Sequence, residues 1–225
     1  MMPGRGMRGA KDALFAAFAS VAQAFANGHR CEILDVLAQG ERSVDELSRE
    51  IEQSVANTSQ HLQVLARAGL VGSRRVGTRV VYRVASDEVT VLWETLRGVA
   101  SARLATVEVL ADEYLGERSE IEHVSADELA ARLANGAVTL LDVRPRGEHA
   151  AGHIRGALAA PLSELSGLLD SLPAGGEVVA YCRGPYCVYA DDAVRLLRAR
   201  GFVARRLDVG FPEWRRAGRP VALAS

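Results

Sequence analysis

The chain has 225 residues, a length that fits one large or two small domains. Its residues are 48% hydrophobic and 24% charged, which is the composition of an ordinary globular protein with enough apolar side chains for a core. It contains no run of 18 apolar residues, so we expect no membrane-spanning segment. The three cysteines are an odd number without the spacing of a disulfide framework, which favours a reducing, cytoplasmic location.

The net charge of −1 hides an uneven distribution of charged residues. Residues 1–86 carry 11 Lys and Arg against 8 Asp and Glu, whereas residues 87–225 carry 16 against 20. Residues 56–86 contain five arginines and no acidic residue. Such a stripe of positive charge is typical of a surface that contacts phosphates, although charge alone fits a solvated arginine-rich face equally well.

The first predicted element is an amphipathic helix. Positive charges followed by apolar residues give the amino terminus a superficial likeness to a signal peptide, but Asp12, Ser20 and Gln23 interrupt the apolar run. The apolar residues follow helical spacing instead. They are Leu14, Phe15, Phe18, Val21, Ala22 and Phe25. A second, short helix is expected over residues 29–38.

Two further helices are predicted close together in the sequence. Ser43-Val-Asp-Glu46 is a capping box that opens one of them. Ser54 can cap the next, which runs from Val55 to Ala68. Its expected core-facing residues are Val55, Leu62, Leu65 and Ala66. Because the turn between the two helices is short, the pair is predicted to be a helix-turn-helix.

A β-hairpin is predicted next, with strands over residues 71–76 and 79–84 and arginines near its tip. Together with the stretch Ser59-Gln-His-Leu-Gln-Val-Leu-Ala-Arg-Ala-Gly-Leu-Val71, these elements resemble the ArsR-type winged-helix transcriptional regulators over about residues 10–115. The resemblance implies that the helix over 55–68 is the recognition helix for DNA and that the hairpin is the wing.

The expected DNA contacts come from these two elements. Short polar side chains on the amino-terminal, non-core side of the recognition helix can reach base edges in the major groove. Arginines of the wing can contact phosphates or the minor groove. The candidates are Ser54, Ala56, Asn57, Thr58, Gln60, His61, Arg74, Arg75 and Arg79. Taken singly, Gln60 and His61 also fit ordinary positions on a helix surface.

One long helix is expected over residues 87–116, because apolar residues recur at three-four spacing from Val89 to Tyr114. A stripe that long needs a partner. We expect pairing with the same helix of a second subunit; packing on its own domain is the alternative. A homodimer would present two recognition helices about one DNA turn apart and would bind an inverted-repeat operator in double-stranded DNA.

We expect no metal and no cofactor. Metal-sensing ArsR-type proteins carry a cysteine pair before the recognition helix, or His and carboxylates on the last helix, and this sequence has neither arrangement. Its five histidines are scattered without ligand spacing. Cys31 is most simply a small core residue, and a redox-active thiol is its alternative.

The second half of the chain contains a notable cysteine. A β-branched segment ends at Cys182, a loop with Gly184 and Pro185 follows, and residues 188–200 have helical spacing of apolar residues. Loop N–H groups and a helix N-terminus can stabilise a thiolate or an anion at this place. The pattern favours a nucleophilic cysteine over a buried cysteine at a strand end.

Three motifs accompany this loop. They are Leu140-Leu-Asp-Val-Arg144, Glu148-His-Ala-Ala-Gly-His-Ile-Arg-Gly-Ala157 and Gly210-Phe-Pro-Glu-Trp214. Together they resemble the rhodanese (sulfurtransferase) domain over residues 121–225. The resemblance implies that Cys182 is the nucleophile that carries sulfur as a persulfide, with Asp142 and Arg144 as supporting residues.

The loop departs from the catalytic pattern of this family. Many active rhodaneses close the loop with a basic residue, where this sequence has Cys187. Pro185 removes one backbone donor, and Arg183 could bind an anion from a different direction. Cys187 is a candidate resolving thiol. The loop can also meet the Cα separation of about 4.4–6.8 Å that a Cys182–Cys187 disulfide requires.

The sequence thus predicts an all-α winged helix-turn-helix with a β-hairpin wing over 10–116, a linker over 117–120, and an α/β rhodanese-like domain with a mostly parallel sheet over 121–225. The predicted function is a homodimeric DNA-binding regulator, a repressor, that senses or carries reactive sulfur such as polysulfide or a persulfide donor. The alternative is a sulfurtransferase enzyme with an accessory winged-helix module.

Overall fold

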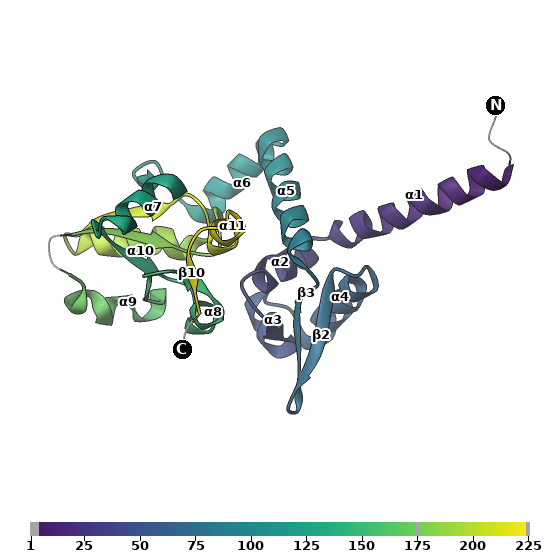
Figure 1. The fold of residues 1–225 in the computed structure, drawn as a ribbon, viewed down its shortest axis with the longest axis horizontal. Coiled ribbons are helices and arrows are strands. Elements are labelled where there is room, and N and C mark those ends of the chain that lie inside the picture. Colours follow the sequence, from purple (N-terminus) through teal and green to yellow (C-terminus); the bar gives the residue numbers. More distant parts are fainter. Residues whose placement is uncertain (1–4, 174–175, 224–225) are drawn as a thin grey trace. The chain divides into compact units, whose positions relative to one another are not determined.

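The computed structural model describes residues 5–173 and 176–223 (Figure 1). The chain forms two units, which we call the amino-terminal unit, through Arg97, and the carboxyl-terminal unit, from Gly98. The division falls inside one helix rather than at the predicted linker over 117–120. The domain ranges 10–116 and 121–225 therefore stay a prediction.

The amino-terminal unit combines helices with a small antiparallel sheet. Its helices are α1 (Arg5–Phe25), α2 (Gly28–Leu37), α3 (Val44–Glu50), α4 (Val55–Arg67) and most of α5 (Asp87–Arg103). Its strands are β1 (Arg42–Ser43), β2 (Val71–Val76) and β3 (Arg79–Val84), in the order β1-β3-β2. The two hairpin strands have the predicted bounds. The pattern did not reveal β1, because two residues are too few for a period-2 signal.

Side-chain caps fix where α2 and the helices of the helix-turn-helix begin. The Oδ1 atom of Asn27 accepts a hydrogen bond from Arg30 N at 3.1 Å. The predicted capping box is present: Ser43 N donates to Glu46 Oε2 at 2.7 Å, and Glu46 N donates to Ser43 Oγ at 3.3 Å. The first N–H groups of a helix have no partner within it, so each cap stabilises the helix by about 1 kcal/mol.

The inward face of α4 differs from the prediction. Thr58, Leu62 and Leu65 are fully buried, and they follow one another at helical spacing. Val55 is 45% exposed and Ala66 is also exposed, so their predicted core positions are wrong. The expected outer position of Thr58 is wrong as well. Its hydroxyl donates to Ser54 O at 3.0 Å, and this hydrogen bond lets a small polar side chain lie in the core.

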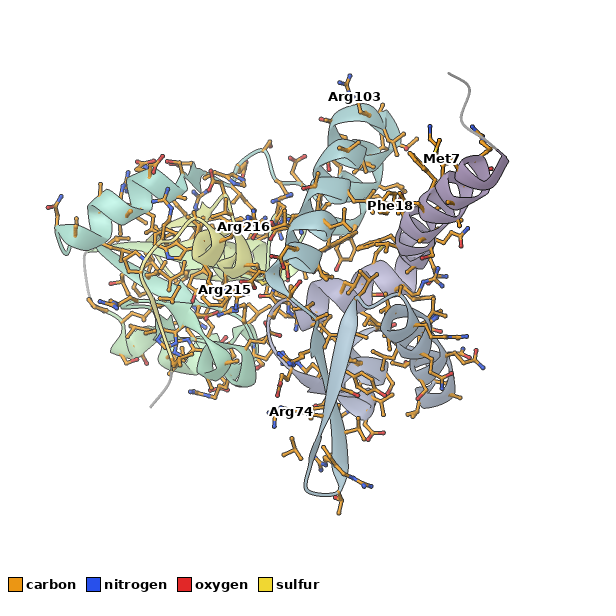
Figure 2. The ribbon with its side chains drawn as sticks, turned by 45° about the vertical axis from the view of Figure 1, so that its right-hand side comes forward. Met7, Phe18, Arg74, Arg103, Arg215 and Arg216 are labelled. Atoms are coloured by element: carbon orange, nitrogen blue, oxygen red, sulfur yellow. A yellow bond between two sulfur atoms is a disulfide. The ribbon has the colours of Figure 1, made fainter. Side chains whose placement is uncertain are left out.

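The long helix predicted over residues 87–116 is instead two helices, α5 and α6 (Ala105–Leu115). Leu104 interrupts them with an extended backbone, φ −111° and ψ 100°. The pattern did not reveal this break because neither Pro nor Gly marks it. Apolar side chains are exposed along α1 and α5 (Figure 2 labels Met7 and Phe18). In the amino-terminal unit they are Met7, Leu14, Phe15, Phe18, Val91, Leu92 and Leu96.

The carboxyl-terminal unit is an α/β domain with a five-stranded parallel sheet, as predicted. The strands are β4 (His123–Val124), β5 (Val138–Asp142), β7 (Leu158–Ala159), β8 (Glu177–Tyr181) and β9 (Val203–Leu207), in the order β4-β9-β8-β5-β7. The helices after α6 are α7 (Ala126–Ala134), α8 (Arg146–Ala151), α9 (Leu162–Leu168), α10 (Val188–Ala199) and α11 (Phe211–Arg216), with a 3-10 turn at Leu169–Ser171. Strands β6 (His153–Ile154) and β10 (Val221–Ala222) form a separate antiparallel pair. In the described part of the chain, no helix has the length and apolar character needed to cross a membrane.

Both faces of β8 are buried. Val178 and Ala180 belong to the core that includes α9 and α10, and so does Cys182 just beyond the strand. Val179 and Tyr181 belong to the core that includes α7 and α11. Burial on both faces is typical of a parallel strand and explains the continuous apolar run. It places Cys182 at the carboxyl end of a central strand, where α/β folds form their sites.

Candidate functional site

The exposed side of α4 carries several of the residues predicted to contact DNA. Ala56, Asn57 and Gln60 are exposed, and His61 is half-buried. Ser54 is exposed too, but its hydroxyl caps the helix by accepting from Asn57 N at 3.2 Å. Sequence reasoning missed Gln63, which is exposed on the same helix face, one turn after Gln60 and two turns after Ala56. The helical spacing 56, 60, 63 was the available signal.

His61 lies beside His29 of α2, with 5.7 Å between the ring centroids. Burial, together with the neighbouring His29 and Arg30, lowers the pKa of His61. The lowered pKa favours the neutral imidazole, which offers one hydrogen-bond donor and one acceptor.

The three predicted arginines of the hairpin are all exposed, but they occupy both of its faces. Arg74 pairs with Val81 and Arg79 with Val76, so Arg74 and Arg79 lie on one face and Arg75 on the other. Figure 2 labels Arg74, whose Nε donates to Glu41 Oε1 at 2.9 Å. This hydrogen bond lowers the pKa of the Glu41 carboxyl. The charge of Arg74 is thus partly balanced within the subunit.

Cys182 and Cys187 are joined by a disulfide, with 6.3 Å between their Cα atoms. Cys182 is buried at the end of β8, and Cys187 is half-buried immediately before α10. Residues 183–186 form the loop between them, which we call the cysteine loop. Gly210, in front of α11, contacts this loop so closely that a Cβ atom there would lie 2.1 Å from Arg183 O. A glycine is therefore required at position 210.

Arg183, predicted to bind an anion, contacts a buried carboxylate. Its Nε donates to Glu148 Oε1 at 3.0 Å, and the Glu148 side chain is fully buried in α8. The positive charge in the loop is therefore compensated. The sequence motif around Glu148 was recognised, but nothing in its spacing indicated this pairing across 35 residues.

Asp142 and Arg144 form a buried ion pair after β5. Arg144 Nε donates to Asp142 Oδ1 at 2.9 Å, and both side chains are fully buried. Tyr181 Oη donates to Asp142 Oδ2 at 2.7 Å, and His149 Nδ1 lies 3.1 Å from the same oxygen. Burial raises the pKa of Tyr181 and lowers that of His149. These residues join the ends of β5 and β8, and the supporting role that the resemblance implies for Asp142 and Arg144 stays a prediction.

A second buried network holds the backbone of the cysteine loop. Arg206 of β9 donates to Gly184 O at 2.8 Å and to Pro185 O at 3.0 Å. The same guanidinium donates to Asp191 of α10 at 2.6 Å, and Arg118 forms an ion pair with Asp191 at 3.0 Å. Sequence reasoning missed all three charged residues, because an isolated charge has no pattern that distinguishes a buried position from a surface one.

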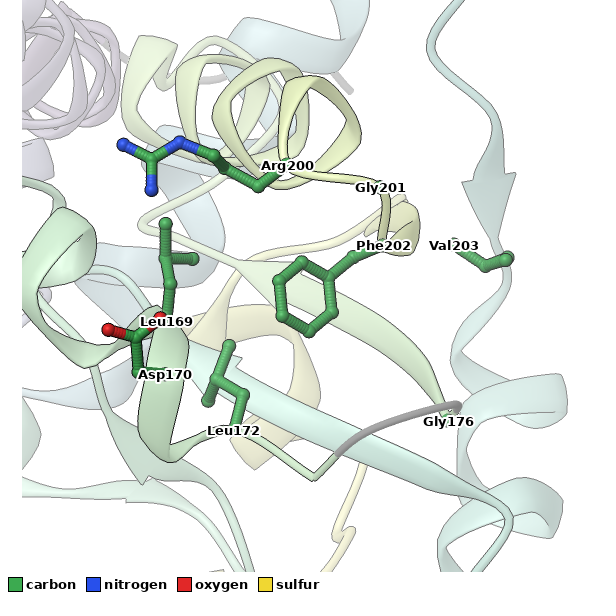
Figure 3. Close-up of a pocket in the computed structure, with 8 residues that line it drawn as sticks. All are labelled: Leu169, Asp170, Leu172, Gly176, Arg200, Gly201, Phe202 and Val203. Carbon is green, nitrogen blue, oxygen red and sulfur yellow. The ribbon is translucent and has the colours of Figure 1, made fainter.

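A cavity of about 340 Å³ lies at the other end of the strands. It lies next to Gly176 and Val203, which adjoin the amino-terminal ends of β8 and β9, and Figure 3 shows Phe202 pointing toward Leu169 and Leu172 inside it. No cysteine lines it. Among residues 5–173 and 176–223, no group of three or more His, Cys, Asp or Glu side chains could hold a metal ion.

Comparisons with known proteins agree with this organisation. Residues 27–73 match the family model of the bacterial regulatory proteins of the arsR family, and residues 125–217 match that of the rhodanese-like domain. The HTH-type transcriptional regulator Rv0324 of Mycobacterium tuberculosis is 46% identical over 211 residues, which cover 94% of this chain and 92% of that protein.

Two other similarities each cover one part of the chain. The human thiosulfate:glutathione sulfurtransferase is 36% identical over 104 residues, covering 40% of this chain and 90% of that enzyme. The solution structure of a homodimeric winged helix-turn-helix DNA-binding domain from Mycobacterium bovis is 39% identical, covers 47% of this chain and 94% of that domain, and has a TM-score of 0.42. The predicted resemblances and fold class are thus confirmed. The chain belongs to the ArsR-type HTH transcriptional regulators, which bind DNA, and it carries a rhodanese-like domain after its winged helix.

Proposed function

We propose that this regulator is a cytoplasmic, dimeric repressor whose rhodanese-like domain senses reactive sulfur through Cys182 and Cys187. The observation that carries the proposal is the pairing of these two cysteines across a single loop. A disulfide between strand end and helix start changes the covalent structure of the loop when it forms or breaks. Cys31, the remaining cysteine, lies in α2, and burial raises the pKa of its thiol.

The chemistry needs a sulfane-sulfur donor such as a polysulfide. The Cys182 thiolate attacks a terminal sulfur of a polysulfide, forms Cys182–S–SH, and releases a polysulfide anion one sulfur shorter. The Cys187 thiolate then attacks Cys182 Sγ, forms the disulfide, and expels HS⁻. The two thiolates are oxidised and the polysulfide is reduced, so no other oxidant is required.

The proposed DNA interface combines α4 with the hairpin. Ala56, Asn57, Gln60 and His61 are placed to meet base edges, and the arginines on both faces of the hairpin can meet phosphates on either side of a minor groove. The dimer follows from the exposed apolar side chains of α1 and α5. Phe15 and Phe18 of α1 form an edge-to-face pair that is more than half exposed, and such a surface is stable in water when a second copy covers it. Two-fold symmetry then implies an inverted-repeat operator.

DNA binding in two redox states tests this function. The purified protein is titrated with a DNA fragment from its own promoter, once reduced and once after polysulfide treatment, and the cysteines are mapped by mass spectrometry. We expect weaker binding after treatment, with a 182–187 disulfide or a persulfide on Cys182. Modification of Cys31 with Cys182 untouched would contradict the assignment of Cys182 as the reactive thiol. Release of DNA that persists in Cys182→Ser would show that the chemistry at Cys182 does not regulate DNA binding.

A sulfurtransferase enzyme is the second candidate function, favoured by the similarity to the human thiosulfate:glutathione sulfurtransferase. Three features of the loop weigh against fast turnover: Cys187 stands where a basic residue is usual, Pro185 lacks an N–H, and the Arg183 charge is paired with Glu148. Sulfide release from thiosulfate and glutathione measures the activity. Multiple turnovers per Cys182 would support this candidate.

A further inference from the structure

We infer that Tyr186 and Arg118 couple the cysteine loop to helix α5, so that the chemical state of the disulfide alters DNA binding through a defined set of contacts. The inference rests on the proposed function and names its route of regulation. Its two contacts at the cysteine loop lie within the carboxyl-terminal unit, which includes the last residues of α5 from Gly98 onward.

The first contact joins the loop to α5 directly. Tyr186 lies inside the cysteine loop, next to Cys187, and its hydroxyl is 2.6 Å from Ser101 Oγ. Ser101 lies in the last turn of α5. The position of Tyr186 depends on the disulfide, because Tyr186 belongs to the short ring that the Cys182–Cys187 bond closes.

The second contact joins the loop to the segment that follows α6. Arg118 Nη2 donates to Pro185 O at 3.3 Å, and Arg118 Nε lies 3.0 Å from the fully buried Asp191 carboxylate of α10. The same segment is held on α10 by its carbonyls: Arg195 donates to Glu117 O at 2.8 Å and Arg198 to Glu120 O at 2.5 Å. The predicted linker over 117–120 is therefore bound to α10, the helix that begins directly after Cys187.

Helix α5 extends these contacts toward the DNA-binding part of the chain. It runs from Asp87 to Arg103, so one helix carries both Ser101 of the carboxyl-terminal unit and Trp93 of the amino-terminal unit. In the amino-terminal unit, Trp93 Nε1 donates to Asp35 of α2 at 2.7 Å, and Arg97 is 3.4 Å from the same carboxylate oxygen. Helix α2 in turn packs in one core with Leu62 and Leu65 of the recognition helix α4. A rotation or shift of α5 at Ser101 should therefore act on α2, and through α2 on the recognition helix α4.

The structure contains the disulfide, which is the form proposed to release DNA, so the Tyr186–Ser101 hydrogen bond belongs to that form. Its removal should raise the DNA affinity of the disulfide form and leave the reduced form unchanged. One neutral hydrogen bond corresponds to a factor of about 2 to 10 in an equilibrium constant. The ratio of the two dissociation constants should therefore fall by about 2- to 10-fold.

The test compares Tyr186→Phe and Ser101→Ala with the wild type and with Tyr189→Phe, a control that removes a hydroxyl just outside the loop. DNA dissociation constants are measured for the reduced and the disulfide form of each full-length protein, and mass spectrometry checks that the disulfide forms. We expect both variants to lower the ratio, Tyr189→Phe to preserve it, and the double variant to match the single ones. Arg118→Gln should also lower the ratio, because the variant loses the guanidinium that contacts both Pro185 O in the loop and the Asp191 carboxylate.

The outcomes separate the two hypotheses. A wild type whose affinity does not depend on the redox state overturns the proposed function and this inference together. A redox-dependent wild type whose ratio survives in Tyr186→Phe, Ser101→Ala and Arg118→Gln overturns this inference alone. Coupling is reciprocal, so operator DNA should also favour the dithiol form. When operator DNA is bound, the reduction potential of the Cys182–Cys187 disulfide should rise by about 30 mV for each tenfold of coupling. The rise should be smaller in Tyr186→Phe.

Discussion

Replacing Arg75 with Ala should weaken DNA binding in a way that depends on salt and not on DNA sequence. Arg75 is exposed on β2, on the hairpin face opposite to Arg74 and Arg79, and we assign it a contact with the backbone of a bound duplex. Each phosphate contact adds about 0.9 to the slope of log affinity against log salt. About six contacts for a dimer give a slope of about −5.4, and loss of Arg75 from both subunits gives about −3.6.

The difference is large over an accessible range of salt. Between about 50 and 200 mM salt, the wild type should lose affinity by about 2,000-fold and Arg75→Ala by about 150-fold. Fluorescence anisotropy with operator and scrambled duplexes measures both slopes. Arg75→Lys keeps the charge and should keep the slope, and Arg155→Ala, an exposed arginine of the carboxyl-terminal unit, should behave as the wild type. An unchanged slope in Arg75→Ala, or a loss confined to the operator sequence, would refute the assignment of the wing.

Four further predictions concern the dimer, the cap, acid stability and the cysteines. Leu96→Asp combined with Leu104→Asp replaces two exposed apolar side chains with charges and should cost several kcal/mol of association, so light scattering should show a monomer; a dimer that persists would place the interface elsewhere. Ser54→Ala removes the hydroxyl that caps α4 and should lower stability by about 1 kcal/mol, seen as a lower Tm by calorimetry, whereas Ser54→Asp should retain the cap. The hydrogen bond from the Ser43 backbone N–H lowers the pKa of Glu46, so the ionised carboxylate stabilises the fold above the ordinary carboxyl pKa, and this stabilisation is lost as the pH falls through the lowered value. Glu46→Gln should therefore make the stability measured with denaturant less dependent on acidic pH. Cys182→Ser should abolish both the disulfide and the persulfide after polysulfide treatment, and mass spectrometry that still finds a persulfide on Cys187 would reverse the assigned roles.

Elements with local signals could be predicted from the sequence. The capping box at Ser43–Glu46 and the hairpin turn at Gly77 act over two to four residues, so their residue types alone indicate the structure. The parallel sheet was expected from the resemblance to the rhodanese domain, and the burial of β8 on both faces accounts for the continuous apolar run before Cys182. The motif around Cys182 located the cysteine pair within this framework.

Features that depend on distant partners could not be predicted. Thr58 is buried because a backbone carbonyl one turn earlier accepts its hydrogen bond, and a hydrophobicity pattern assigns such a residue to the surface. Leu104 breaks a helix in which its own type is favourable. Arg118 and Arg206 meet Asp191 across 73 and 15 residues, respectively, and the spacing of single charges carries no information about such pairings.

In α4, the residues that stabilise the helix are different from the exposed residues proposed to contact bases, and this has a consequence for how these regulators come to bind new operators. Ser54 and Thr58 hold the helix in place, whereas the side chains of Ala56, Asn57 and Gln60 are exposed, and the cap at Asn57 uses only its backbone N–H. Substitutions at these three positions should leave folding almost unchanged while they alter the bases that the helix can recognise. Operator preference can therefore drift among relatives without passing through unstable intermediates, and a library randomised at positions 56, 57 and 60 should yield folded proteins with new operators.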